Sequence, residues 1–71
     1  MPTSGPQLRK ERRSAAVTRK WITATAVALQ MGISRGQLYV IEAQLAPDEK
    51  YVLAHREAVK TLRDATGESA A

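Results

Sequence analysis

The sequence predicts an all-α domain of three to four short helices, and three observations favour this class. Apolar residues recur at spacings of three and four along most of the chain, which is the period of an amphipathic helix. No segment alternates apolar and polar residues as a half-buried strand does. The length of 71 residues allows one small domain with one modest core.

The two ends of the chain favour irregular structure. Residues 1–8 begin with "MPTSGP", which contains two prolines, one glycine and two small hydroxyl residues, and we expect a flexible arm there. Residues 9–65 form the predicted domain. Residues 66–71 are mostly small, and we expect a disordered tail or the start of a linker.

The first helix is expected within "QLRKERRSAAVTRKWI", residues 7–22, with its clearest signal from Ser14 onward. The amino-terminal half of this segment is highly charged. Two states therefore remain open for it, a helix or a segment that is disordered in the absence of a polyanion. Trp21 and Ile22 come between this helix and the next one, and a tryptophan at such a junction is expected in the core.

Capping residues define the next two helices. Thr23 has a hydroxyl that can accept an unpaired backbone N–H, so a second helix is expected to follow in "ATAVALQM". Gly32 suits the left-handed position that ends a helix. Ser34 is the predicted cap of a third helix that runs to about Gln44.

A fourth helix is expected with Pro47 in its first turn, followed by acidic residues near the positive end of the helix dipole. One face carries Tyr51, Val52, His55, Ala58, Val59 and Leu62. That face either closes the core over the second and third helices or forms a homodimer interface. His55 is assigned to packing or to an interface, because a metal site needs three or four converging ligands.

Positive charge is concentrated in the first half of the chain. Up to Arg35 there are seven basic residues and one acidic residue, whereas from Gly36 onward there are four basic and six acidic residues. This asymmetry indicates a polyanionic partner, with nucleic acid first and an acidic membrane surface second. The chain has no cysteine, no apolar run that could span a membrane and no signal-peptide core, so a cytoplasmic location is expected.

Small and apolar residues surround the predicted turn between the second and third helices. Ala28 permits two helices to cross closely, Gly32 permits a tight turn, and Ile33 fills the angle between the helices. In this respect residues 24–43, "ATAVALQMGISRGQLYVIEA", resemble the helix-turn-helix of bacterial and phage repressors. The matching framework residues are Val27, Ala28, Gly32, Ile33, Leu38 and Ile41. The alternative is an ordinary helical hairpin with no role in nucleic-acid binding.

The run "GISRG" is also similar to the turn and the start of the reading helix in KorA-like regulators of conjugative plasmids. That resemblance implies a role in gene control or in plasmid stability. The amino-terminal part of this chain is shorter and more basic than in those regulators, and no matching dimerisation segment is evident.

The helix-turn-helix resemblance implies that the third helix lies in the major groove, with its amino-terminal residues nearest the bases. The residues expected to face inward are Leu38, Ile41 and Leu45. The centre of the opposite face carries Gly36, Val40 and Ala43. The residues expected to read bases are Arg35, Gly36, Gln37, Val40 and Gln44. Glutamine suits adenine, arginine suits guanine, valine suits a thymine methyl group, and glycine allows close approach.

A second set of residues is expected to contact phosphates. These are Ser34, Tyr39, Arg19, Lys20, Arg9, Lys10, Arg12 and Arg13. If this basic stretch is helical, Arg19 and Lys20 lie near the DNA backbone beside the motif. If it is unfolded, an arm reaches into an adjacent minor groove with Arg9, Lys10, Arg12 and Arg13. A merely solvated charge run is the alternative. Glu42 would repel phosphate, so we expect it to face away from DNA and to brace the scaffold or a nearby arginine.

These patterns favour a DNA-binding protein over an enzyme, and no catalytic set, cofactor, metal site or small-molecule ligand is predicted. The expected partner is double-stranded DNA, read by monomers side by side on repeats or by a homodimer. The expected role is that of a transcriptional repressor or plasmid-maintenance factor that acts by occupancy and is associated with the nucleoid. A protein-interaction module is the second hypothesis, and a peripheral membrane element is the third.

Overall fold

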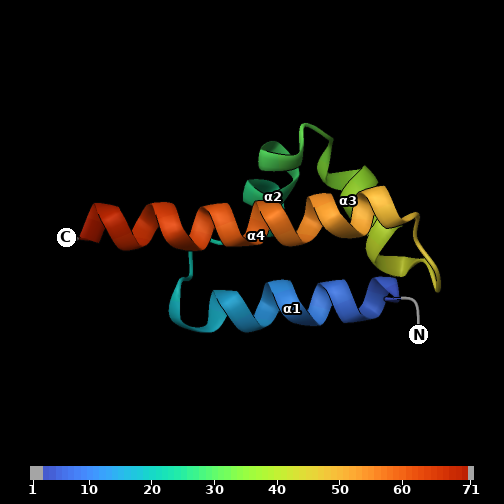
Figure 1. Cartoon of the computed structure of the whole chain (residues 1–71), viewed down its shortest axis with the longest axis horizontal. Coiled ribbons are helices and arrows are strands. Elements are labelled where there is room, and N and C mark those ends of the chain that lie inside the picture. Colours follow the sequence, from blue (N-terminus) through green and yellow to red (C-terminus); the bar gives the residue numbers. More distant parts are fainter. Residues whose placement is uncertain (1–2, 71) are drawn as a thin grey trace.

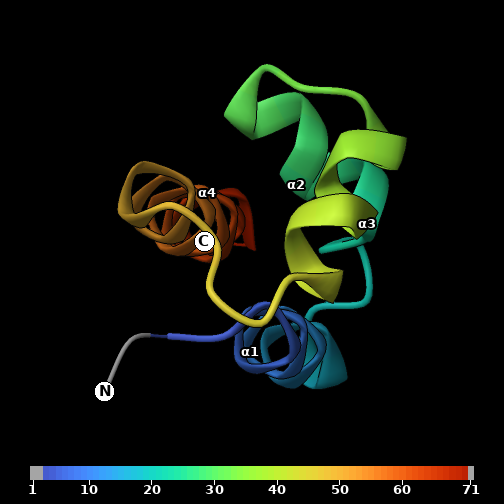
Figure 2. The same cartoon turned by 90° about the vertical axis from the view of Figure 1, so that its right-hand side faces the viewer.

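The structure is a computed structural model that describes residues 3–70, and the side chains within residues 3–64. The described residues form helices and no strand, as the sequence predicts. The helices are α1 (Gly5–Thr18), α2 (Ala24–Met31), α3 (Arg35–Ala43) and α4 (Glu49–Ala70). Helices α1 and α4 run side by side in the same direction, and α2 and α3 pack against them (Figures 1 and 2).

Helix α1 begins earlier than the sequence suggests. The Ser4 hydroxyl accepts a hydrogen bond from the Gln7 N–H at 3.3 Å, and Pro6 lies in the first turn. Residues 5–8 therefore belong to a helix and not to the expected arm, and the charged segment that follows them is helical. Leu8 is fully buried, and burying this side chain favours the helical state. The helix ends at Thr18, short of the predicted limit at residue 22.

Gly5 places the start of α1 directly against the end of α3. Its N–H donates to the carbonyl oxygen of Gln44 at 2.7 Å. A Cβ atom at this position would overlap the backbone of Ile41, Glu42 and Gln44. Only glycine therefore permits this approach of the two backbones.

The turn between α2 and α3 follows the predicted capping pattern. The Thr23 hydroxyl accepts from the Ala26 N–H at 3.1 Å. Gly32 adopts the left-handed conformation, with φ 76° and ψ 30°. The N–H groups of Gly32 and Ile33 donate to the carbonyls of the last turn of α2 at 3.1 and 3.0 Å, which closes the helix end.

Helix α4 begins after Pro47, whereas the sequence places this proline in the first turn. The Asp48 carbonyl accepts from the N–H groups of Tyr51 and Val52 at 2.9 and 3.1 Å, so Asp48 is the capping position. Pro47 is buried just outside the helix. Its fixed backbone angle directs the chain into the cap.

The buried side chains form two connected clusters. The first contains Ile22, Ala24, Val27, Ala28, Leu38, Ala58 and Val59, and the second contains Leu8, Ile41 and Val52. Met31 and Ile33 pack against both clusters. The predicted apolar face of α4 therefore closes the core, against α1 and α2 in particular, so the alternative use of that face as a dimer interface is excluded for its buried residues.

Two apolar residues that the sequence places inside are exposed. Leu45 is 84% exposed because α3 ends at Ala43 and Gln44 is extended, so the helical spacing from Leu38 does not continue to it. Trp21 is 44% exposed, and the neighbouring Ile22 occupies the core instead. Within the described residues, no helix has the length and apolar character needed to cross a membrane.

Candidate nucleic-acid interface

The outer face of α3 carries small and medium-sized side chains. Leu38, Ile41 and Glu42 are the buried residues of this helix. Gly36, Val40 and Ala43 lie on the opposite face, where the sequence analysis places them, and all three are exposed. This side of α3 therefore has no large side chain along its centre.

Gly36 is not required by the fold. The only glycine with a positive φ among the described residues is Gly32. A Cβ added at Gly36 would meet no atom closer than the Ser34 hydroxyl at 3.9 Å. The absence of a side chain at this position therefore affects what can approach α3 from outside, and has no role in internal packing.

Ser34 and Gln37 form a reciprocal capping box at the start of α3. The Gln37 N–H donates to the Ser34 hydroxyl, and the Ser34 N–H donates to the Gln37 Oε1 atom, both at 3.1 Å. The amide oxygen of Gln37 is thus engaged, although both residues are exposed. The bidentate contact with adenine that the sequence suggests needs both ends of the amide, so Gln37 has only its NH₂ group free for it. The spacing of Ser34 and Gln37 already indicates this box.

The remaining candidate residues on α3 flank the bare face. Arg35 is exposed at the start of the helix, and Gln44 is exposed at its end. Tyr39 is 49% exposed and lies on the side of α3 that faces α1. The hydrogen bond to Glu42 is the main cause that raises the pKa of Arg12 on α1, and the electrostatic effect of Tyr39 adds to it.

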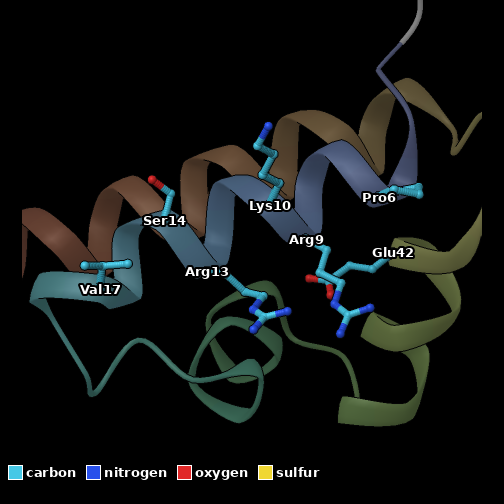
Figure 3. Close-up of a pocket in the computed structure, with 7 residues that line it drawn as sticks. All are labelled: Pro6, Arg9, Lys10, Arg13, Ser14, Val17 and Glu42. Atoms are coloured by element: carbon cyan, nitrogen blue, oxygen red, sulfur yellow. The ribbon is translucent and has the colours of Figure 1, made fainter.

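Arg9 and Arg13 extend the basic surface onto α1. They line an open concavity of about 580 Å³ together with Pro6, Lys10, Ser14, Val17 and Glu42. In Figure 3 the two arginine side chains point from α1 toward the side of α2 and α3, whereas Lys10 and Ser14 point away. Positive charge on α1 is thus held beside α3 by the helical spacing of four residues.

Arg12 does not belong to this surface, and its assignment to a phosphate contact is wrong. The side chain is buried and forms a two-pronged ion pair with Glu42. Its Nε atom lies 2.9 Å from Oε2, and its Nη2 atom lies 3.0 Å from Oε1. The expectation that Glu42 braces a nearby arginine is confirmed.

His55 completes a buried cluster that joins three helices. Its Nε2 atom lies 2.8 Å from the Glu42 Oε2 atom, and its side chain is fully buried. Burial would raise the pKa of Glu42, but the hydrogen bonds from Arg12 and His55 outweigh it, so the pKa lies below its usual value. Glu42 therefore stays ionised and connects α3 to α1 and to α4.

A signal for this cluster is present in the sequence. Arg12 stands four residues after Leu8, Glu42 four after Leu38, and His55 three after Val52. Each polar residue thus occupies a position that the helical period places inside. Complementary charges at such interior positions indicate partners in a buried pair.

Most of the cations in the first half of the chain are left without a carboxylate partner. Glu11, the acidic residue of α1, pairs with Arg56 of α4 at 3.0 Å. The Arg19 Nη1 atom donates to the Thr18 hydroxyl at 3.3 Å, and Lys20 is exposed just after α1. Within the part of the chain that the structure describes, six of these cations form no ion pair: Arg9, Lys10, Arg13, Arg19, Lys20 and Arg35.

The fold and this surface define a small all-α domain with a basic side around α1 and α3. No protein-family model matches the chain, and comparison with curated proteins and with solved structures finds no match. Among the described residues, no group of three histidines or carboxylates is arranged to hold a metal ion. The candidate functional residues are therefore the exposed residues of α3 and the cations beside it that form no ion pair among the described residues.

Proposed function

We propose that the protein binds duplex DNA at specific sequences, with α2, the turn and α3 acting as a helix-turn-helix. One observation carries this proposal. The outer face of α3 is bare at Gly36, a position where the fold has room for a side chain. Cations that form no ion pair among the described residues lie near that face, at Arg35 and on α1. Close approach to a polyanion accounts for both features.

Base recognition would come from a few exposed side chains of α3. Val40 is 58% exposed and would contact a thymine methyl group, as would Ala43. Gln44 has a free amide and would pair with adenine, whereas Gln37 would contribute a single donor. Arg35 would donate either to guanine or to a phosphate.

Phosphate contacts would come mainly from α1. Arg9 and Arg13 flank the α3 face, and the Tyr39 hydroxyl adds a donor on the same side. Arg19 and Lys20 add charge at the far end of α1. Because these contacts carry no sequence information, they would supply affinity for any duplex and a strong dependence on salt.

The role that follows is occupancy of a DNA site without any chemical step. A protein of this kind acts as a transcriptional repressor or as a plasmid-maintenance factor, and would be associated with the nucleoid. Covering a promoter excludes other proteins, and covering a repeat array marks a DNA segment. The partner is duplex DNA in both cases.

The experiment that tests the proposal is selection of bound duplexes from a random-sequence pool at physiological salt. We expect an enriched sequence motif. Half-sites in inverted order would indicate a homodimer, and half-sites in direct order would indicate monomers side by side. Absence of enrichment, with binding that disappears at this salt, would contradict specific recognition.

A protein-interaction module is the second candidate, and one observation favours it. A shallow apolar pocket of about 200 Å³ lies beside the α3 face, lined by Ile33, Gln37, Val40, Ile41, Gln44 and Tyr51. An apolar partner side chain would fit it. Binding to such a partner would persist at high salt, whereas binding to DNA would weaken steeply, so the salt dependence distinguishes the two functions.

A further inference from the structure

A second basic groove lies between α1 and α4. It has a volume of about 530 Å³ and follows the two helices where they run side by side. Five cations line it: Lys10, Arg19, Arg56, Lys60 and Arg63. The proposed contacts of α3 with DNA use neither Lys60 nor Arg63, so this groove is a feature that the proposed function leaves unexplained.

The charge in this groove is largely uncompensated. Glu11 is the acidic residue that lines it, and it is bound by Arg56 through two hydrogen bonds of 3.1 and 3.0 Å. Lys60 and Arg63 are exposed and form no ion pair with any residue that the structure describes. Lys10 and Arg19 likewise lack a carboxylate partner there. A polyanionic ligand would provide the missing countercharge.

The spacing and polarity of the groove fit a sugar–phosphate backbone. Lys60 and Arg63, the groove cations of α4 without an ion pair among the described residues, are three residues apart, which is about 4.5 Å along the helix at about 1.5 Å per residue. One DNA strand advances by about 3.4 Å per phosphate along the duplex axis, so the two cations can face successive phosphates. Amide and hydroxyl groups of Gln7 and Ser14 line the same groove, and such groups commonly bind phosphate oxygens.

An acidic peptide fits less well. Tight peptide recognition depends on pockets that bury aromatic or aliphatic anchors. The apolar residues that line this groove are Ala15 and Val59, and Val59 is only 7% exposed. The surface therefore offers regular charge without anchor pockets, which favours a regular polyanion.

The groove and the α3 face lie on different sides of α1. Figure 2 views the bundle along α1 and α4, and above α1 it shows α4 to the left and α3 to the right. Arg9 and Arg13 line the concavity toward α3, whereas Arg19 and Arg63 line the groove toward α4. The buried residues of α3 pack against α4, so the outer face of α3 is turned away from α4 and from this groove.

We infer that the α1–α4 groove binds the phosphate backbone of a second duplex, so that one chain links two segments of DNA. The inference rests on the proposed function only for the first duplex, which occupies α3. The second contact reads no bases, since its ligands are cations, hydroxyls and amides directed at phosphates. It acts on whichever DNA segment is nearby.

The test is a bridging assay with two variants that lose the same charge. One duplex with the selected site is fixed to beads, and capture of a fluorescent random-sequence duplex is measured. The groove variant carries Lys60→Gln and Arg63→Gln, and the α3-side variant carries Arg9→Gln and Arg13→Gln. Sedimentation of each protein gives its oligomeric state, and circular dichroism shows whether it is folded.

We expect the wild-type monomer to capture the second duplex and the groove variant to capture at least tenfold less of it. The groove variant should keep its affinity for the selected site within about threefold. The salt dependence of capture should weaken by about two units of log–log slope, about one unit for each phosphate that the variant no longer neutralises. The α3-side variant should lose binding to the selected site instead.

Three results would overturn the inference while leaving the proposed function intact. They are a wild type that binds its site but captures no second duplex, capture by the groove variant equal to that of the wild type, and capture that occurs only in a dimer. A groove variant that loses the selected site as strongly as the second duplex would assign the groove to the same DNA. By contrast, an α3-side variant that binds the selected site normally would contradict the proposed function and not the groove.

Discussion

Two glycines of this chain have opposite consequences for the fold. At Gly5 a side chain would overlap the backbone at the end of α3, whereas at Gly36 there is open space. The first glycine is therefore a requirement of packing. The second is free to vary as far as the fold is concerned, so its effect on binding can be measured separately from its effect on folding.

We predict that Gly36→Leu lowers the affinity for the selected DNA site at least tenfold, because a large side chain holds α3 away from the bases. Stability should be unchanged or rise by up to about 1 kcal/mol, since leucine favours helix more than glycine does. DNA titration and thermal unfolding measure the two effects. Normal DNA affinity in this variant would show that α3 does not lie in the major groove of DNA.

Gly5→Ala is the matched substitution, and it should have the reverse effect. Overlap with the α3 backbone is expected to cost about 1–3 kcal/mol of folding stability, as in other overpacked sites. The fraction of the variant that remains folded should bind DNA with the same affinity as the wild type. Unfolding in denaturant gives the first quantity, and titration corrected for the folded fraction gives the second.

Substitutions on α3 and on α1 distinguish the reading of bases from the attraction of charges. Gln44→Ala should weaken binding to the selected site by about 1–3 kcal/mol and leave random DNA nearly unaffected. Arg9→Gln together with Arg13→Gln should weaken both kinds of DNA alike and reduce the salt slope by about two units. If the Gln44 variant affected both DNAs equally, the adenine contact would be excluded.

Among the elements, α3 is held against α1 and α4 by buried charged residues as well as by apolar packing. Glu42 accepts from Arg12 on α1 and contacts His55 on α4, with distances of 2.8–3.0 Å. All three residues are buried. A buried pair of this kind is costly to break, because removal of one partner leaves the other charge without compensation.

Glu42→Gln should lower the free energy of unfolding by about 3–5 kcal/mol, which is a large share of the stability of a small domain. Arg12→Met combined with Glu42→Leu and His55→Leu should recover most of that loss, since apolar residues then replace the whole buried cluster. Glu57→Gln, at an exposed position of α4, is the control and should have little effect. Unfolding in urea compares the variants, and equal stability of Glu42→Gln and wild type would contradict the role of the cluster.

The same cluster predicts a loss of stability in acid. The pKa of Glu42 is lower in the folded chain than its usual value of 4.5. The folded state therefore gains stability that is complete above the usual value, and loses it as the pH falls through the folded pKa. Glu11, whose pKa is lowered mainly by the hydrogen bond from Arg56, contributes in the same direction. Stability of wild type should fall below about pH 4.5, and that of Glu42→Gln should fall less steeply.

Local signals in the sequence identify α2, the turn and α3, because caps and the left-handed glycine depend on residues only a few positions away. The start of α1 depends instead on contacts between Gly5 and Gln44 and on the burial of Leu8. Arg12 shows the same limit, because its partner is 30 residues away. Composition alone suggests that an arginine in a basic run binds phosphate. The helical period gives a different result, because it places both Arg12 and Glu42 at interior positions.

At the scale of the whole molecule, the chain is a largely apolar core with basic surfaces on both sides of α1. Toward α3 these are Arg9 and Arg13, and toward α4 they are Lys60 and Arg63. The net charge of +4 understates this arrangement. Glu42 and Glu11 each neutralise one arginine, and the other acidic residues stand at position 48 or later. The cations up to Arg35 other than Arg12 therefore have no carboxylate partner among the described residues.

The distance along the chain between the members of the buried cluster affects how the protein forms during synthesis. Arg12 leaves the ribosome 30 residues before Glu42, and Glu42 leaves it 13 residues before His55. Helix α1 therefore stays charged and without its partner while the rest of the domain is made. Until α4 emerges, Glu42 on α3 lacks its contact with His55. If the proposed function holds, a nascent chain would attract nucleic acid through its first helix before α3 is able to distinguish one sequence from another.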